Sequence, residues 1–144
     1  MREIKANQIK DKIKELFLRA NYHTNPDLMN RLTEDLKEET SEIGKSVLKM
    51  IIENNKIASR EEVPICQDTG LAVVFVEIGQ EVRLIDGNFT EAINQGVKEA
   101  YQEGYLRKSV VDDPVFERKN TKTNTPAIIY TDTVSYTHLT LPTN

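Results

Sequence analysis

The sequence changes from helical to strand-like at residues 63–78, which read Val63-Pro64-Ile65-Cys66-Gln67-Asp68-Thr69-Gly70-Leu71-Ala72-Val73-Val74-Phe75-Val76-Glu77-Ile78. Pro64 fixes its own φ and Gly70 permits a positive φ, so residues 66–69 are predicted to form a sharp loop. The run over 71–78 is rich in β-branched residues and nearly continuous, which predicts a strand covered on both faces. Side chains of such a loop converge on a point, as a chemical site requires.

Three amphipathic helices are predicted before this loop. Apolar residues at helical spacing indicate the first, over about residues 3–20. The stretch Asn25-Pro26-Asp27 supplies a cap, a first-turn proline and a dipole-matched acid, and it opens the second helix. Ser41 opens the third, and Asn54-Asn55 marks its fraying end. Each helix carries one apolar stripe, so these helices are expected to pack against something beyond themselves.

After the strand, the pattern indicates a hairpin and then a further helix. Gly79-Gln80 is predicted to turn the chain back, so that residues 82–85 pair with the first strand. Thr90 is predicted to cap a helix that runs through about residue 105. Its expected inward residues include Ile93 and Val97.

Residues 106–125 show no periodicity, and a loop this long in a compact domain is usually functional or disordered. A strand is predicted to restart over residues 126–130. The expected fold is therefore α+β (mixed α/β), with a helical N-terminal layer over residues 1–60 packed on a mixed β-sheet within residues 61–133.

The composition narrows the class of protein. A chain of 144 residues with 38% hydrophobic and 29% charged residues is typical of one globular domain. Its net charge of −4 and scattered basic residues disfavour a nucleic-acid partner. No stretch approaches the roughly 20 apolar residues of a membrane span, so no membrane partner is expected. The single cysteine and the lack of an apolar signal region indicate a cytoplasmic protein.

The end of the chain differs in character from the rest. Residues 134–143 read Val134-Ser135-Tyr136-Thr137-His138-Leu139-Thr140-Leu141-Pro142-Thr143, which is the translation of an adapter used in transposase-based sequencing libraries. We therefore expect residues 134–144 to be a non-native tail, and residues 1–133 to be the N-terminal part of a longer domain. The alternative is a genuine edge strand.

The loop around Cys66 admits several kinds of chemistry. With Asp68 and Thr69, the thiol could ligate a metal or act as a nucleophile, or the loop could be an Asx-type turn in which Asp68 bonds backbone amides. The sequence offers no nearby histidine for a Cys–His pair, since His23 is distant and His138 belongs to the tail. The nucleophile is therefore disfavoured. The simplest alternative is a small buried hydrophobic cysteine.

Several motifs in this chain occur together in one known family. The sequence resembles the N-terminal part of the class I iron–sulfur hydro-lyases, which are fumarate hydratases and L-tartrate dehydratases, here of the type with separate alpha and beta subunits. The resemblance runs from the first helix to about residue 133. The motifs that carry it are Pro64-Ile65-Cys66-Gln67-Asp68-Thr69-Gly70, Ala72-Val73-Val74-Phe75-Val76-Glu77-Ile78-Gly79-Gln80, Glu91-Ala92-Ile93-Asn94-Gln95-Gly96-Val97, Gly104-Tyr105-Leu106-Arg107-Lys108-Ser109-Val110-Val111, Asp113-Pro114 and Asn124-Thr125-Pro126-Ala127.

The resemblance implies a cofactor and a set of site residues. It implies a 4Fe-4S cluster held by three cysteines with one iron open, and Cys66 as the first ligand. Gln67, Asp68 and Thr69 are implied as substrate contacts, with Asp68 as a catalytic hydrogen-bond partner of the substrate hydroxyl. Arg107 is implied to grip a substrate carboxylate, which a planar guanidinium does bidentately. Outside the motif, Arg107 would more often be a helix-dipole partner.

The resemblance also implies the reaction and the partners. The substrate is expected to be a small C4 dicarboxylic acid, hydrated or dehydrated reversibly, and fumarate/malate cannot be separated from tartrate/oxaloacetate by these residues. A beta subunit is expected as partner, in a heterotetramer or a dimer of alpha–beta pairs. The competing interpretation is a non-catalytic α/β interaction domain with a structural cysteine.

Two departures from the family pattern bear on activity. Family members commonly have Thr-Gly-Asp-Asn-Thr-Pro where this chain has Thr121-Lys122-Thr123-Asn124-Thr125-Pro126, so a glycine and an acid are replaced. Asn120, Asn124 and Thr125 are equally consistent with turn formation and with lining the site. The two further cluster cysteines and a catalytic base are absent. One thiolate cannot hold the cluster, so the chain alone is expected to be inactive.

Overall fold

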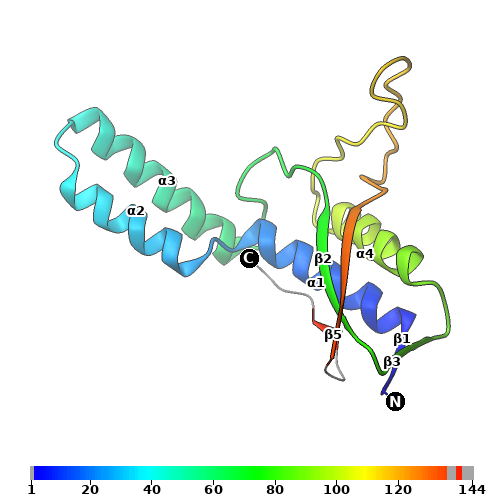
Figure 1. Ribbon diagram of the computed structural model, residues 1–144. Helices are drawn as coiled ribbons and strands as arrows, with labels where there is room; N and C mark the ends of the chain where they lie inside the picture. The colour runs from blue at the N-terminus through cyan, green and yellow to red at the C-terminus, as the bar shows by residue number, and fades with distance from the viewer. Residues whose placement is uncertain (1, 136–138, 141–144) are drawn as a thin grey trace.

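The computed structural model describes residues 2–135 and 139–140. It confirms an α+β fold, in which helices and strands are arranged as Figure 1 shows. In chain order the elements are β1 (Arg2–Lys5), α1 (Ala6–Tyr22), α2 (Pro26–Glu38), α3 (Glu42–Glu61), β2 (Val73–Gly79), β3 (Val82–Ile85), α4 (Phe89–Glu103), β4 (Ile128–Val134) and β5 (Leu139–Thr140).

The core lies between two helices and one face of a small sheet. Helices α1 and α4 lie side by side and cover β2 (Figure 1). Ion pairs flank the helix contact, with Lys10 Nζ 3.5 Å from Glu99 Oε2 and Lys14 Nζ 2.5 Å from Glu103 Oε2. The inward residues predicted for α4 are all buried. The central buried side chains are Ile9, Ile13, Val74, Val76, Ala92, Ile93, Val97, Ala100 and Tyr101.

Gly96 permits the close approach of α1 and α4. A Cβ atom at this position would lie 2.5 Å from the backbone oxygen of Lys10 and 2.9 Å from the Cβ of Ile13. Backbone and a β-branched core side chain cannot move aside cheaply, because the interior is close-packed. The distance between the two helices therefore depends on the missing side chain.

The strands pair differently from the predicted hairpin. β2 pairs in parallel with β4 and antiparallel with β5, whereas β3 pairs in parallel with β1. The hairpin prediction was wrong because both edges of β2 are already paired near its end. On one edge, Glu77 and Ile78 pair with residues 132–133 of β4; on the other edge, they pair with the two residues of β5. The turn at residues 79–81 therefore leads to another strand pair.

The sheet has one buried and one exposed face. Val74 and Val76 point into the core, but Val73, Phe75 and Tyr130 are about half exposed. The rings of Phe75 and Tyr130 stack on this outer face with centroids 5.1 Å apart. The prediction of a strand covered on both faces was thus wrong for the part of the chain that the structure describes.

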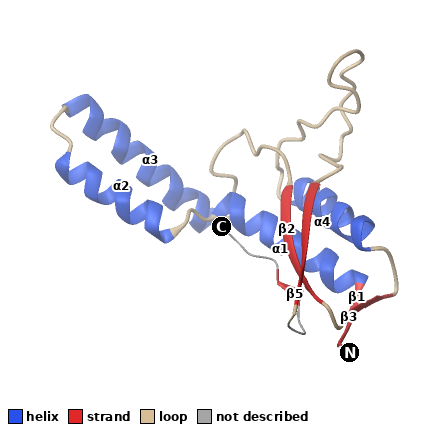
Figure 2. Ribbon diagram, in the orientation of Figure 1, coloured by secondary structure: helices blue, strands red, loops and turns tan. Residues whose placement is uncertain are grey.

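Helices α2 and α3 form an arm that extends away from the sheet (Figure 2). The two helices pack on each other, and no residue of α2 is buried. The N-terminal helical layer therefore packs on the sheet through α1, and the arm does not join it. The starts of both arm helices are confirmed: Asn25 Oδ1 accepts from the Asp27 N–H at 2.9 Å, and Ser41 Oγ accepts from the Gly44 N–H at 3.3 Å.

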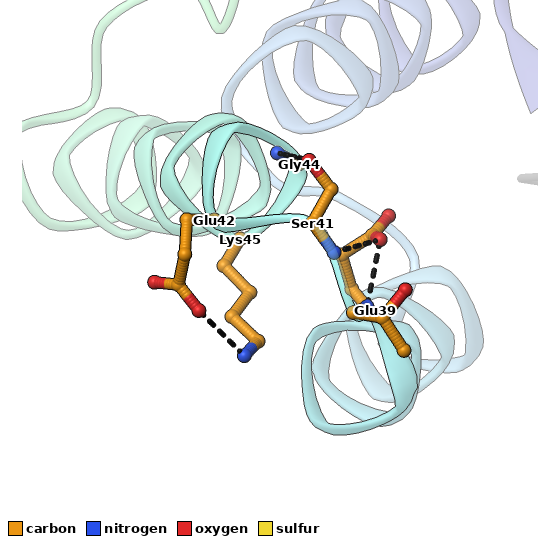
Figure 3. A network of polar contacts seen from close by, with 6 residues as sticks. Glu39, Ser41, Glu42, Gly44 and Lys45 are labelled. Carbon is orange, nitrogen blue, oxygen red and sulfur yellow. Dashed lines mark hydrogen bonds and ion pairs between the residues drawn. The ribbon is translucent and has the colours of Figure 1, made fainter.

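A compact polar network closes the turn between the arm helices (Figure 3). The Glu39 carboxylate accepts the backbone N–H groups of Thr40 and Ser41, each at 2.8 Å. Beside it, Lys45 forms an ion pair with Glu42 at 2.9 Å. These local bonds satisfy backbone donors that the short connection leaves free, which explains why the chain reverses here.

Three predicted boundaries were wrong. Residues 2–5 form a strand beside β3 and do not belong to the first helix. α3 continues past Asn54-Asn55 to Glu61. Both amides have partners: Asn55 is buried and donates to the Ile51 oxygen, and Asn54 donates to the Ile65 oxygen. The cap of α4 is Asn88 and not Thr90, since Asn88 Oδ1 accepts from the Glu91 N–H at 3.1 Å.

The predicted restart of a strand near residue 126 is confirmed by β4, which runs on to Val134. Most of the expected non-native tail lies outside the described residues, which include only positions 134, 135, 139 and 140 of it. Among the helices that the structure describes, none is long and apolar enough to cross a membrane.

Replacing Gly96 by Ala should destabilise the protein. Overpacking a close-packed core costs about 1–3 kcal/mol, which exceeds the gain of about 1 kcal/mol in helix propensity. Urea unfolding should therefore show a lower free energy of unfolding for Gly96→Ala. Lys98→Ala, on the exposed side of the same helix, is the control and should stay within about 0.5 kcal/mol of the wild type. Equal stability of all three proteins would contradict the close helix contact.

Candidate functional site

The loop that carries the cysteine is a tight turn held by its own polar groups. The Gly70 N–H donates to Asp68 Oδ1 at 3.3 Å, and the Asp68 N–H points at Cys66 Sγ at 3.5 Å. The Asx-type turn is therefore confirmed, with Gly70 at φ 66°. The thiol of Cys66 is exposed, as are Gln67 and Asp68, so the simple buried cysteine is excluded.

The segment that carries Arg107 lies directly beside this loop. Thr69 Oγ1 donates to the backbone oxygen of Arg107 at 3.0 Å. Leu106 is buried and its N–H donates to the Tyr101 oxygen, which anchors the segment to the end of α4. The Arg107 side chain is exposed. Two stretches that are about 40 residues apart in sequence thus meet at one place.

The side chain of Asn124 bonds to both the Cys66 loop and the Arg107 segment. It is fully buried, at 0% exposure. Its Oδ1 accepts the N–H groups of Ser109 at 2.7 Å and Val110 at 3.1 Å, and its Nδ2 donates to the Gly70 oxygen at 3.2 Å. Asparagine also tolerates the left-handed backbone at this position, where φ is 57°.

Tyr101 of α4 supports the cysteine loop from the core. Its hydroxyl lies 3.0 Å from the Thr69 oxygen and 3.2 Å from the Gly70 oxygen, and its ring is buried. Burial raises the pKa of this hydroxyl, contacts with Thr69 and Asn124 lower it, and the nearby Asp68 carboxylate raises it, with a net upward shift. The phenol is therefore held in its neutral form.

The long loop after Arg107 is ordered by a second asparagine. Asn120 Nδ2 donates to the Lys108 oxygen at 2.8 Å, and its Oδ1 accepts from the Lys122 N–H at 2.7 Å. Lys122 has a φ of 61°, the left-handed conformation that glycine favours. Lys122, which stands where the family commonly has glycine, thus adopts a backbone conformation that glycine would also allow.

At the far end of this loop, Asp113 caps a turn. Its Oδ1 accepts the N–H groups of Val115 at 2.8 Å and Phe116 at 3.1 Å. These hydrogen bonds lower the pKa of the Asp113 carboxyl, because they favour the charged form. The loop thus has its own internal support, and it leaves the valine and phenylalanine side chains exposed.

The structure brings together the residues expected at the site. Cys66, Gln67, Asp68 and Thr69 share one loop, and the backbone oxygen of Arg107 accepts the hydrogen bond from Thr69. The sequence left open whether Asn124 forms a turn or lines the site, and Tyr101 was expected only as an inward residue of its helix; their bonds to these loops were not predicted. His23 lies elsewhere, with its Nδ1 2.8 Å from Ser59 Oγ, so it joins the end of α1 to α3 and takes no part in the loop around Cys66.

The donor set of the described residues fits one corner of a metal centre. Cys66 supplies an exposed sulfur, the kind of ligand that iron–sulfur clusters use, and the Asp68 N–H lies 3.5 Å from it. Within residues 2–135 and 139–140, no group of three or more His, Cys, Asp or Glu side chains could hold a metal ion. Further ligands would therefore have to come from elsewhere.

Comparison with known proteins identifies relatives of most of the chain. The sequence model of the family described as fumarate hydratase (Fumerase) matches residues 10–143. A protein of Methanocaldococcus jannaschii named "Putative L(+)-tartrate dehydratase subunit alpha" is 45% identical over 118 residues, which is 81% of this chain and 41% of that protein.

Two further relatives are more distant. The L(+)-tartrate dehydratase subunit alpha of Escherichia coli is 32% identical over 99 residues, covering 69% of this chain and 32% of that protein. Fumarate hydratase 1, mitochondrial, of Leishmania major is 37% identical over 92 residues, covering 63% of this chain and 17% of that protein. The chain thus spans less than half the length of each of these relatives.

Replacing Tyr101 by Phe should flatten the loss of stability at alkaline pH. Because the folded-state pKa of Tyr101 lies above the ordinary value of 10.0, its contribution is present below pH 10 and is lost as the pH rises through the folded value. At pH 8 the variant should be less stable by about 1 kcal/mol, the usual net loss for a hydrogen bond. Between pH 8 and 11 its free energy of unfolding, measured with urea, should fall less than that of the wild type. An equal fall in the free energy of unfolding of both proteins over this pH range would contradict the raised pKa of Tyr101.

Proposed function

This chain belongs to the fumarate hydratase family, and we propose on that basis that it is the N-terminal part of the alpha subunit of a hydro-lyase. The reaction is the reversible addition of water to a C4 dicarboxylic acid, from fumarate to malate. The observation that carries the proposal is the meeting of the Cys66 loop with the Arg107 segment, joined at 3.0 Å through Thr69. Residues 1–133 are the part of the subunit that builds this half of the site.

Cys66 is the proposed ligand of a 4Fe-4S cluster. Thiolates suit such clusters, and the exposed position of Cys66 leaves room for a cofactor that other ligands must also reach. When bound by three cysteines, the cluster would supply an open iron that acts as a Lewis acid toward a carboxylate and a hydroxyl. The Asp68 N–H lies 3.5 Å from the sulfur and would face the cluster side of the loop.

The neighbouring side chains are proposed to hold the substrate. Arg107 would bind one carboxylate through two parallel N–H···O bonds, which fixes the orientation of the diacid. Asp68, the proposed catalytic residue, would bond the substrate hydroxyl, and Gln67 and Thr69 would complete the polar wall of the site. All of these residues except half-buried Thr69 are exposed, so a substrate can reach them.

The rest of the active site would come from outside these residues. The remaining cluster ligands and the catalytic base are expected from later segments of a complete subunit, because one sulfur cannot hold the cluster. A beta subunit is the proposed partner, in a heterotetramer or a dimer of alpha–beta pairs, and two of the relatives carry the name subunit alpha. The single cysteine, which can form no internal disulfide, suits the reducing cytoplasm.

L-tartrate dehydration is the second candidate reaction. It is favoured by the two relatives named L(+)-tartrate dehydratase, which are the ones that cover most of this chain. Fumarate/malate and tartrate/oxaloacetate both present two carboxylates and a hydroxyl to Arg107 and Asp68. A substrate panel on the complete alpha–beta complex distinguishes the two reactions.

Replacing Cys66 by Ala should abolish iron binding and hydration activity in the complete complex. The alpha subunit completed from its intact reading frame is purified without air together with its beta subunit, and iron content and hydration of fumarate are measured. Lys98→Ala, far from the loop on the exposed face of α4, is the matched control and should keep both. The 144-residue chain alone should show neither cluster absorbance nor turnover after anaerobic reconstitution with iron and sulfide.

Two results would contradict the proposal. Unchanged iron content and turnover in Cys66→Ala would favour a non-catalytic interaction domain or a different site. Turnover by a wild-type complex that contains no iron would show that the reaction proceeds without the cluster.

A further inference from the structure

Two buried polar side chains cross-link the segments that carry the proposed site. Asn124 is fully buried and Tyr101 is 1% exposed. Asn124 bonds to backbone groups of both segments, and the Tyr101 hydroxyl bonds to backbone oxygens of the Cys66 loop. A buried amide or hydroxyl that lost such partners would be left unsatisfied at a substantial cost, so these bonds restrain the backbone.

The amide of Asn124 fixes one loop against the other. Its oxygen accepts two N–H groups, from Ser109 at 2.7 Å and Val110 at 3.1 Å, while its nitrogen donates to the Gly70 oxygen at 3.2 Å. Both ends of one planar group are therefore used on opposite segments. Ser109 lies two residues after Arg107, and Gly70 lies four residues after Cys66.

Tyr101 connects the cysteine loop to the rigid core. Its hydroxyl reaches the oxygens of Thr69 and Gly70, and its ring packs near Phe17 of α1 with centroids 6.2 Å apart. The Gly70 oxygen is thus shared by Tyr101 and Asn124. The loop is held from the helix side and from the neighbouring segment at the same carbonyl.

We propose that Asn124 and Tyr101 are positioning residues that set the placement of the Cys66 thiol relative to the Arg107 side chain. Neither touches the substrate or the cofactor. The inference rests on the proposed function, in which Cys66 holds the cofactor and Arg107 the substrate carboxylate. A productive site needs its groups held to within about 0.5 Å, and exposed loop residues do not reach that precision without such support.

Spin labels on the two loops test the inference. Cys66 is the only cysteine, so a nitroxide attaches there alone. A second label is placed on the other segment as Arg107→Cys in a Cys66→Ser background. Electron paramagnetic resonance spectra give the mobile fraction of each label in the folded 144-residue chain.

Three substitutions should change the label mobilities in two distinct patterns. Asn124→Asp keeps the acceptor oxygen and removes the donor to Gly70, so the mobile fraction at position 66 should at least double while position 107 stays unchanged. Tyr101→Phe should give the same result. Asn124→Ala removes both sets of bonds, and both labels should become mobile.

A core variant separates positioning from general stability. Ile93→Val removes a methyl group from a fully buried residue of α4 and leaves these hydrogen bonds intact. It should leave both labels at wild-type mobility. If the Asn124 variants do not fold, Tyr101→Phe alone decides. Wild-type mobility at position 66 in folded Tyr101→Phe, or an equal increase in Ile93→Val, would overturn the inference.

Kinetics of the complete alpha–beta complex link the inference to catalysis. Asn124→Ala should raise the KM for the diacid at least five-fold, while Ile93→Val should keep the wild-type KM. An unchanged KM in Asn124→Ala would overturn the positioning role. A wild-type complex that acts on neither fumarate nor tartrate would contradict the proposed function, and the label measurements would then still decide the inference.

Discussion

The candidate site depends on one buried amide. The Cys66 loop, the Arg107 segment and the loop before β4 contain no described helix or strand beyond one isolated bridge, between Val111 and Asn120, so backbone groups such as the Ser109 N–H have no ladder to join. Asn124 supplies the missing partners by bonding Ser109, Val110 and Gly70 at once. Exposed loops without such support are usually mobile, so this side chain gives the irregular part of the molecule a fixed shape.

The Asn124 amide can fix the loops only because they lie against a closely packed core. Helices α1 and α4 approach closely at Gly96 and cover the buried face of β2. Tyr101 belongs to this core, and its hydroxyl bonds the same Gly70 oxygen as Asn124. Tyr101 thus joins the core to the cysteine loop, while Ile65, at the start of the loop, bonds to Asn21 of α1 and Asn54 of α3.

Helix caps and turns, which depend on neighbouring residues, could be predicted from the sequence. Strand pairing and contacts between distant segments could not. The caps at Asn25 and Ser41 act within three residues, so the starts of α2 and α3 were predicted correctly. The partner of β3 is decided by which strand edges remain open in the folded chain, and the sequence does not carry that information locally. The Asx turn at Asp68 was visible as one alternative. The role of Asn124 was not, because its partner Gly70 lies 54 positions away.

A double-mutant cycle on the free energy of unfolding tests most directly whether Tyr101 and Asn124 support the Cys66 loop together. Tyr101→Phe, Asn124→Ala and the double variant are compared with the wild type in urea. Since both side chains bond the same carbonyl, we predict a coupling energy of about 0.5–3 kcal/mol between them. Effects that add to within about 0.3 kcal/mol would contradict a shared support for the Cys66 loop.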